Sequence, residues 1–321
     1  MNRWREVRQW RDRLRNLDPS AFDTGLSPAG AGAAWNAALE ALSDEALERA
    51  AEAPGVPWSS ATFIAARTVF TAPIEWLALL LGHGTAVRWK SAAGARVSAQ
   101  AIAAAAEDLP LTLQQDRSLS GEVIFAMGSD PTIAEIQASL PANTTFFGFG
   151  SRYSAAWIEG AWDAIAEDAA FYDGRGCFSP GVVFSSAPDA AEQLAAAMTS
   201  AQNRLPVGEI SDAEHAAIRA RRALAKVTGK VFEGEGWSVH QLPAERWTPA
   251  ALPRSIALVS CAPDELPQLL RRFPGLSTLG TERTIAFAGL RQCLPGQMQK
   301  PAVNRVHDGI FLPAAVLRPN K

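Results

Sequence analysis

Residues 122–149 have the sequence EVIFAMGSDPTIAEIQASLPANTTFFGF. The apolar run from Glu122 to Met127 predicts a strand, and Thr144 to Phe149 predicts a second one. Between them, Ser129-Asp130-Pro131 combines an N-cap residue with a proline in the first turn, which predicts a helix through Leu140. A strand, a helix and a strand with short connections form the unit from which parallel sheets are built.

The same alternation extends to both sides of this stretch. Upstream we predict strands over residues 61–68, 86–90 and 112–115, and helices over 74–81 and 95–106. Downstream we predict a long helix from Ser154 to Tyr172, strands over 182–185, 255–260 and 284–288, helices over 189–201, 211–227 and 263–273, and a hairpin over 230–242. The pattern predicts an α/β fold with a parallel, doubly wound sheet.

The composition is that of a globular protein. The chain has 321 residues, 48% of them hydrophobic, and a formal net charge of −3. This size allows two α/β domains, and the charge balance implies neither nucleic acid nor an anionic membrane as a partner. We find no signal peptide and no apolar run that approaches a membrane span. With three cysteines and no paired spacing, we expect a cytoplasmic protein with reduced thiols.

The N-terminal segment from Asn2 to Leu17 predicts an amphipathic helix. An apolar stripe lies on one face and arginines surround it; the stripe consists of Trp4, Val7, Trp10, Leu14 and Leu17. A helix on a membrane surface or on an acidic partner would have such a pattern. A terminal helix docked on the protein by its apolar stripe is the favoured interpretation. Two further helical stretches follow, over residues 33–42 and 44–53.

A lone cysteine, Cys177, lies in the sequence FYDGRGCFSP over residues 171–180. Gly174 and Gly176 precede it, and the strand predicted at Val182 follows. A cysteine on a glycine-rich turn between a helix and a strand can be reached by a substrate, and its thiolate is a strong nucleophile. The alternative is a small buried hydrophobic residue, which is the usual place of a free cysteine.

Several other kinds of site are not indicated. Phe147 to Tyr153 contains Gly148 and Gly150 but has Tyr153 where the third glycine of a dinucleotide fingerprint would stand. No P-loop is present. The four histidines are scattered, and no metal-ligand spacing occurs, so we predict no metal site. A cysteine–histidine pairing in space stays open, although nothing local favours it.

Several stretches, in this order, resemble the aldehyde dehydrogenase superfamily. They are Val69 to Trp76, Arg88-Trp89-Lys90-Ser91, Phe125 to Ser129, Gly148-Phe149-Gly150, and Gly176-Cys177. The resemblance is closer to its acyl-CoA reductase branch, the LuxC family of fatty-acid reductases. That match rests on Phe147 to Ser154, on Asp173 to Pro180, and on Gly296-Gln297-Met298-Gln299 with His307-Asp308-Gly309. It extends from about Ala61 to the C-terminus.

The resemblance implies reduction of an acyl thioester to an aldehyde through a thioester on Cys177. It implies that Lys90 and Ser91 hold the adenosine ribose or its 2′-phosphate, and that Gly128 and Ser129 bind the pyrophosphate at a helix start. Gly148 and Gly150 belong to the same cofactor site. No acidic residue closely follows Arg88 to Ser91 in the sequence, so we expect Lys90, with Arg88 or Arg96, to favour NADPH over NADH. The acyl donor would be acyl-CoA or an acyl-carrier or acyl-transferring protein, and the oligomeric state stays open, with a homo-oligomer among the alternatives.

Two positions depart from the superfamily pattern. Thr71 stands where the superfamily has an asparagine that serves as an oxyanion-hole donor; a hydroxyl can also donate, together with the backbone N–H of Cys177. No glutamate stands near Gly148 to activate water. Cys177 with Gly174 and Gly176 favours the enzyme. Thr71 favours the rival hypothesis, a non-catalytic acyl-CoA or acyl-carrier binding protein on the same fold.

The resemblance also implies two lobes, each with a largely parallel sheet. We expect an N-terminal helical segment over residues 1–55 and a Rossmann-like cofactor lobe over 56–160. A catalytic lobe with Cys177 would span 161–290, and a C-terminal tail that wraps back would span 291–321.

Overall fold

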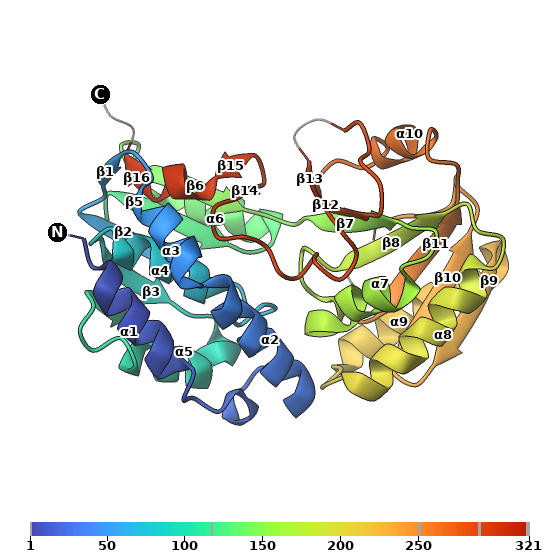
Figure 1. Ribbon diagram of the computed structural model, residues 1–321, viewed down its shortest axis with the longest axis horizontal. Helices are drawn as coiled ribbons and strands as arrows, with labels where there is room; N and C mark the ends of the chain where they lie inside the picture. The colour runs from blue at the N-terminus through green and yellow to red at the C-terminus, as the bar shows by residue number, and fades with distance from the viewer. Residues whose placement is uncertain (1, 117, 250–251, 288–289, 319–321) are drawn as a thin grey trace. The chain divides into compact units, whose positions relative to one another are not determined.

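The computed structural model describes residues 2–116, 118–249, 252–287 and 290–318 and divides into two compact units (Figure 1). Unit 1 comprises Met1–Thr24, Ala34–Ser151 and Pro301–Lys321, and unit 2 comprises Gly25–Ala33 and Arg152–Lys300. The chain therefore passes between the units at four points, after residues 24, 33, 151 and 300. Each unit is built around its own sheet.

Unit 1 contains a five-stranded parallel sheet in the order β4-β3-β2-β5-β6. Its strands are β2 (Ser60–Ile64), β3 (Ala86–Lys90), β4 (Leu111–Leu113), β5 (Val123–Met127) and β6 (Thr145–Phe149). After β2, the chain adds β3 and β4 on one side of it and then β5 and β6 on its other side. The order thus reverses between β2 and β5, which makes this pair a topological switch point. The parallel sheet predicted from residues 122–149 is confirmed.

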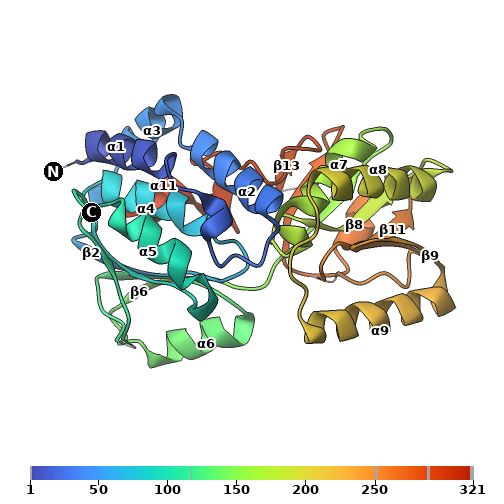
Figure 2. The same ribbon diagram turned by 90° about the horizontal axis from the view of Figure 1, so that it is seen from below.

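Helices cover both faces of the unit 1 sheet. They are α4 (Ala72–Gly82), η2 (Ala93–Ala95), α5 (Arg96–Ala104) and α6 (Asp130–Ser139). The ring of Trp76 on α4 lies 5.2 Å from that of Phe125 and 5.0 Å from that of Phe149, and all three side chains are buried. Figure 2 shows α6 on the face opposite to α4. A Cβ on Gly148 would lie 2.5 Å from Ile133 Cγ2, so the glycine lets α6 approach the sheet.

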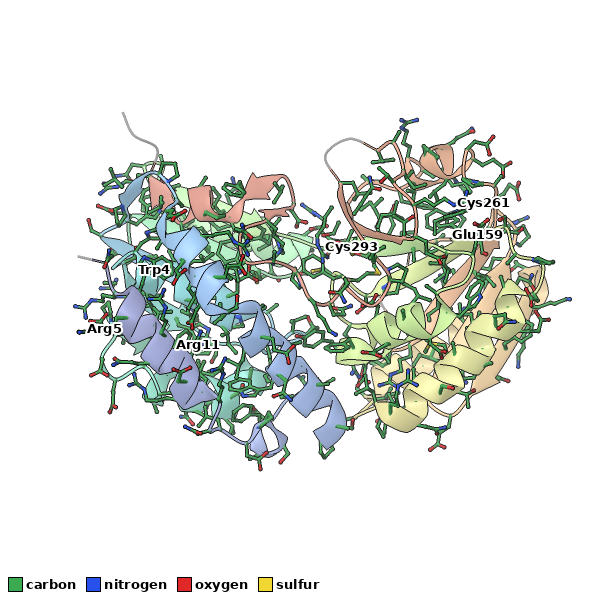
Figure 3. The ribbon with its side chains drawn as sticks, in the orientation of Figure 1. Trp4, Arg5, Arg11, Glu159, Cys261 and Cys293 are labelled. Carbon is green, nitrogen blue, oxygen red and sulfur yellow. The ribbon has the colours of Figure 1, made fainter. Side chains whose placement is uncertain are left out.

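The N-terminal helix docks by its apolar stripe, as predicted. Helix α1 (Trp4–Leu14) buries Trp4, Val7, Trp10 and Leu14. The indole of Trp10 donates to the carbonyl of Ile102 at 3.2 Å, and Arg11 pairs with Asp44 at 2.7 Å; Trp4 and Arg11 are labelled in Figure 3. The neighbouring elements are η1 (Pro19–Ala21), α2 (Pro28–Ala41), α3 (Asp44–Ala51) and β1 (Val56–Pro57). At least one of the arginines that surround the stripe, Arg11, therefore forms an ion pair within the protein.

The C-terminal segment adds small elements to unit 1. They are β14 (Val306–His307), β15 (Ile310–Phe311), α11 (Leu312–Ala315) and β16 (Leu317–Arg318). Strand β16 pairs antiparallel with β1, and the indole of Trp58 donates to the carbonyl of Ala315 at 3.2 Å. These contacts attach the last part of the chain to the beginning of unit 1.

Unit 2 contains a seven-stranded sheet in the order β13-β12-β7-β8-β11-β10-β9, parallel except for β9. Its strands are β7 (Tyr153–Trp157), β8 (Pro180–Ser185), β9 (Lys230–Gly234), β10 (Trp237–Leu242), β11 (Ser255–Ser260), β12 (Leu276–Thr281) and β13 (Arg291–Cys293). The predicted hairpin over 230–242 is confirmed as β9 and β10.

Helices cover both faces of the unit 2 sheet as well. One apolar cluster joins the sheet to α7 (Trp162–Ala170) and α8 (Ala190–Arg204), and the other joins it to α9 (Asp212–Thr228) and α10 (Leu266–Leu270). Helix α9, predicted over 211–227, begins with a capping box in which Ser211 and Glu214 bond each other's backbone N–H groups. Both units are thus three-layered α/β structures, as the strand–helix alternation predicts.

Two sequence predictions in unit 2 are wrong. Ser154 to Tyr172 is a strand, β7, followed by the shorter helix α7, because β7 is a central strand between β12 and β8 and its buried position overrides the helix propensity of its alanines. Residues 284–287 form no strand, and Ala288 lies outside the described residues. The side chain of Gln292 bonds both the N–H and the carbonyl of Ile285, so these groups are not used in a ladder.

Candidate functional site

Cys177 lies on a turn whose backbone conformation is unusual. Helix α7 ends at Ala170, and η3 (Phe171–Gly174) follows. Three consecutive residues have positive φ: Tyr172 at 49°, Asp173 at 54° and Gly174 at 71°. A left-handed conformation costs a residue with a side chain about 1–2 kcal/mol, so surrounding contacts must fix this turn. Cys177 is half-buried.

A buried ion pair fixes the turn before Cys177. The Asp173 carboxylate accepts from Arg254 Nη2 at 2.7 Å and from Arg254 Nε at 3.1 Å, and the two side chains are only 2% and 1% exposed. The backbone N–H groups of Gly208 and Arg254 also donate to Asp173, to its carboxylate and its carbonyl. A Cβ on Gly174 would lie 3.1 Å from the nitrogen of Arg254, so the glycine allows this close approach.

Arg175 attaches the same turn to helix α9. Its Nε donates to Glu214 at 2.8 Å, its Nη2 donates to the carbonyl of Glu209 at 2.6 Å, and its Nη1 donates to Asp173 at 3.0 Å. The hydrogen bond from Arg175 is the main cause that lowers the pKa of Glu214 to about 2. The charged residues of the sequence DGRGC therefore position the cysteine.

The turn after Cys177 is held by neutral groups. Ser154 Oγ on β7 donates to the carbonyl of Cys177 at 2.6 Å, and the N–H of Ser179 donates to the carbonyl of Gly176 at 3.0 Å. Gln299 Nε2 donates to Ser179 Oγ at 3.1 Å and to the carbonyl of Asp168 at 3.0 Å. Backbone contacts on both sides of Cys177 thus fix the position of its Cα.

A buried carboxyl group, Asp168 on α7, anchors the segment that carries Gln299. It accepts the N–H groups of Gly296 at 2.6 Å and Met298 at 3.1 Å. Burial raises the pKa of Asp168 to about 7, against these hydrogen bonds and the charge of Arg291, which lower it. The GQMQ sequence at 296–299 therefore closes over Asp168 within unit 2.

This raised pKa predicts a pH-dependent stability. The folded state binds the proton of Asp168 more tightly than the unfolded state, so its contribution to the free energy of unfolding falls as the pH rises from about 4 to about 7. Arg291 and Cys293 are the other ionisable groups coupled to it. We expect Asp168→Asn to remove a pH-dependent difference on the order of 2–4 kcal/mol, measured by urea unfolding at several pH values. Parallel pH curves for the variant and the unmodified protein would contradict this assignment.

The predicted cofactor residues of unit 1 follow the carboxyl ends of neighbouring parallel strands. Lys90 ends β3 and Ser91 follows it, Gly128 and Ser129 follow β5, and Gly148 and Gly150 lie at the end of β6. Because β2 and β5 form the switch point, this edge is where open α/β sheets bind ligands. The structure therefore brings all six residues to one edge of the sheet, the edge formed by the carboxyl ends of its parallel strands.

The start of helix α6 lies at this edge. Ser129 is its N-cap, and the Ser129 side chain accepts from the N–H of Thr132 at 3.4 Å. Asp130 was predicted as part of the helix start but not as a site residue. Its carboxylate accepts the N–H of Ser151 at 2.7 Å, which attaches the segment after β6 to α6. The N-terminus of a ten-residue helix beside glycine is suited to a phosphate.

The other predicted catalytic residue, Thr71, is the buried N-cap of α4 in unit 1. Cys177 belongs to unit 2. Their joint action stays a prediction.

Sequence reasoning missed the residues that hold the cysteine turn and one residue near the cofactor edge. Asp173 and Arg254 meet only through the fold, 81 positions apart. Hydrogen bonds from Gln114 and Ser118, with a smaller contribution from the charge of Lys90, lower the pKa of Asp116. No acidic residue closely follows Arg88 to Ser91 in the sequence, but the pairing of β3 with β4 brings Asp116 to this strand end from further along the chain.

The family model described as acyl-CoA reductase (LuxC) matches residues 112–312, more than half of the chain. The chain belongs to the LuxC family of acyl-CoA reductases. A comparison with curated protein sequences gave no match. The family match makes the LuxC chain an aldehyde-forming oxidoreductase.

Solved structures similar to the LuxC chain are aldehyde dehydrogenases and related proteins. Aldehyde dehydrogenase 21 from Physcomitrella patens, in complex with succinate, is 10% identical with a TM-score of 0.76 and covers 97% of this chain and 80% of its own. PnpE from Pseudomonas sp. WBC-3 is 12% identical with a TM-score of 0.78 and the same two coverages. Glyceraldehyde-3-phosphate dehydrogenase GapN from Methanocaldococcus jannaschii, complexed with NADP, is 12% identical with a TM-score of 0.73, covering 91% and 80%. These likenesses confirm the two-lobe fold.

None of the described helices is long and apolar enough to span a membrane. No group of three or more metal-ligating side chains occurs in the part of the chain that the structure describes.

Proposed function

We propose that the LuxC chain reduces an acyl thioester to an aldehyde through a thioester on Cys177, with NADPH as the reductant. The observation that carries the proposal is the fixed turn of Cys177 within the family match over residues 112–312. Acyl-CoA or an acyl-carrier or acyl-transferring protein would be the donor. The reaction would take place in the cytoplasm, where cysteine thiols stay reduced.

The first step uses groups of the chain itself. The Cys177 thiolate attacks the carbonyl carbon of the donor, a carbon–sulfur bond to Cys177 forms, and the bond to the donor sulfur breaks. The donor leaves as a thiol and takes up a proton in place of the one that Cys177 lost. The backbone N–H of Cys177 and the hydroxyl of Thr71 are the proposed donors to the oxyanion.

The edge of the unit 1 sheet fits a nicotinamide cofactor. Lys90 and Ser91 would hold the adenosine ribose with its 2′-phosphate, and the α6 N-terminus with Gly128 and Ser129 would hold the pyrophosphate. Gly148 and Gly150, at the end of β6, would belong to the same site. When bound, the cofactor would supply a hydride to the acyl carbon; the carbon–sulfur bond to Cys177 then breaks, the aldehyde leaves and the Cys177 thiolate is restored. We thus propose unit 1 as the cofactor lobe, corresponding to the predicted segment 56–160, and unit 2 as the catalytic lobe, corresponding to 161–290.

The acyl group on Cys177 should resist water. Efficient hydrolysis needs a general base, which contributes roughly 10²–10⁴-fold. Gly148, Phe149 and Gly150 have no side chain that accepts a proton. Glu159 and Glu167 in unit 2 are paired with Arg283 and Arg204.

We therefore expect aldehyde and NADP⁺ to yield acyl-CoA when CoA is present and very little free acid when CoA is absent. Product analysis of these two incubations tests the proposed function. Rapid acid formation without CoA would refute the reductase direction, and Glu159→Gln and Glu167→Gln would then identify the base. Absence of any acyl adduct on the protein after incubation with acyl-CoAs would favour the non-catalytic binding protein.

A further inference from the structure

The loop that follows β4 begins at the same edge of the sheet as Lys90 and contains Asp116. The N–H of Gln114 donates to the carbonyl of Trp89 at 2.8 Å, and the N–H of Ala65 donates to the carbonyl of Lys90 at 3.0 Å. The chain thus leaves β4 alongside the last residues of β3, and Lys90 lies between the ends of β2 and β4. The exposed residue Asp116 follows two positions after Gln114.

Asp116 is fixed and ionised within this loop. Its Oδ1 accepts from Gln114 Nε2, from Ser118 N at 2.9 Å and from Ser118 Oγ at 2.7 Å. Hydrogen bonds from Gln114 and Ser118, with a smaller contribution from the charge of Lys90, lower the pKa of Asp116 to about 2. Among the described residues Oδ2 has no hydrogen-bond partner, so one oxygen of a fixed carboxylate is available to a ligand.

The basic side chains at this edge differ in the contacts that they already make within the protein. The guanidinium of Arg88 donates to Ser120 Oγ. Arg67 lies against Gly94, where a Cβ would be 2.8 Å from its Nε, and among the described residues no ion pair engages it. Lys90 is half-buried at the end of β3, next to the Trp89 carbonyl that accepts from Gln114, so this edge carries both signs of charge.

We infer that Asp116 is a specificity-determining residue that limits the NADPH preference conferred by Lys90. The inference rests on the proposed function. A carboxylate accepts a hydrogen bond from the ribose 2′-hydroxyl of NADH, whereas it repels the 2′-phosphate of NADPH. Lys90 attracts that phosphate, so the two side chains act in opposite directions and NADH stays a usable reductant.

Calorimetric titration with 2′,5′-ADP and with 5′-AMP tests this inference without turnover. Both nucleotides share the adenosine and the 5′-phosphate, and only 2′,5′-ADP has the 2′-phosphate. We expect Asp116→Asn to raise the preference for 2′,5′-ADP over 5′-AMP about tenfold, and Lys90→Ala to lower it about tenfold. Glu52→Gln, which removes the same charge from an exposed position on another element of unit 1, should change the preference less than threefold.

The outcomes separate the inference from the proposed function. A change of less than threefold for Asp116→Asn, with both nucleotides bound by the unmodified protein, overturns the role of Asp116 and leaves the reductase proposal standing. An Asp116→Asn effect equal to that of Glu52→Gln also overturns it, because a long-range charge effect would then be sufficient. Failure of the unmodified protein to bind either nucleotide overturns the cofactor site and the inference together.

Discussion

Cys177→Ala is expected to abolish both the acyl adduct and NADPH consumption, while Cys261→Ala and Cys293→Ala keep nearly full activity. Burial raises the pKa of Cys261 to about 12, with Glu265 and Asp264 adding to the effect, and burial also raises the pKa of Cys293. A thiol that stays protonated at neutral pH is a poor nucleophile. Figure 3 labels both control cysteines, which lie in unit 2 as Cys177 does.

Intact-mass analysis after incubation with a panel of acyl-CoAs measures the acyl adduct on each variant directly. The added mass identifies the acyl group, and the panel reports which chain lengths are accepted. An adduct that persists in Cys177→Ala would refute the mechanism, because one of the other two thiols would then carry the acyl group.

The second large effect is expected for Arg254→Met. This change leaves the Asp173 carboxylate buried without its main partner, and breaking such a pair typically costs about 3–5 kcal/mol of unfolding free energy. We expect a destabilisation in that range and an acylation rate reduced by at least tenfold, because the left-handed turn before Cys177 loses its support. Urea unfolding and the rate of adduct formation measure the two effects.

Arg204→Met is the matched control. Arg204 pairs with Glu167 at 4.0 Å, and both side chains are about half exposed, so the loss should stay below about 1 kcal/mol. If Arg254→Met is destabilised but acylates at the rate of the unmodified protein, the pair serves stability alone and the positioning role of Asp173 is wrong.

Local sequence signals predicted the elements of unit 1 well. The N-cap at Ser129 and the apolar runs on either side of it are local properties, and strands β5 and β6 lie within two residues of their expected bounds. The failure at Ser154 to Tyr172 has a different origin. Whether an alanine-rich run becomes a strand depends on the neighbours that bury it, and β12 comes more than a hundred residues later in the chain.

The residues of the candidate site also divide into those that the local sequence predicts and those that it does not. A cysteine on a glycine-rich turn is visible in the sequence, and so is a basic residue at a strand end. The partner of Asp173 is not visible, since nothing local distinguishes Arg254 from the other arginines. Asp116 was missed because parallel strand register, rather than sequence distance, sets what lies beside Lys90.

The last of the four points at which the chain passes between the units affects the order in which the units can fold during synthesis. All residues of unit 2 precede position 301, whereas unit 1 still requires β16, which pairs with β1 more than 250 residues earlier. On the ribosome, unit 2 is therefore complete in sequence while unit 1 still lacks a strand. The nascent chain can thus assemble the turn of Cys177, the proposed nucleophile, before the fold proposed to bind the reductant is finished.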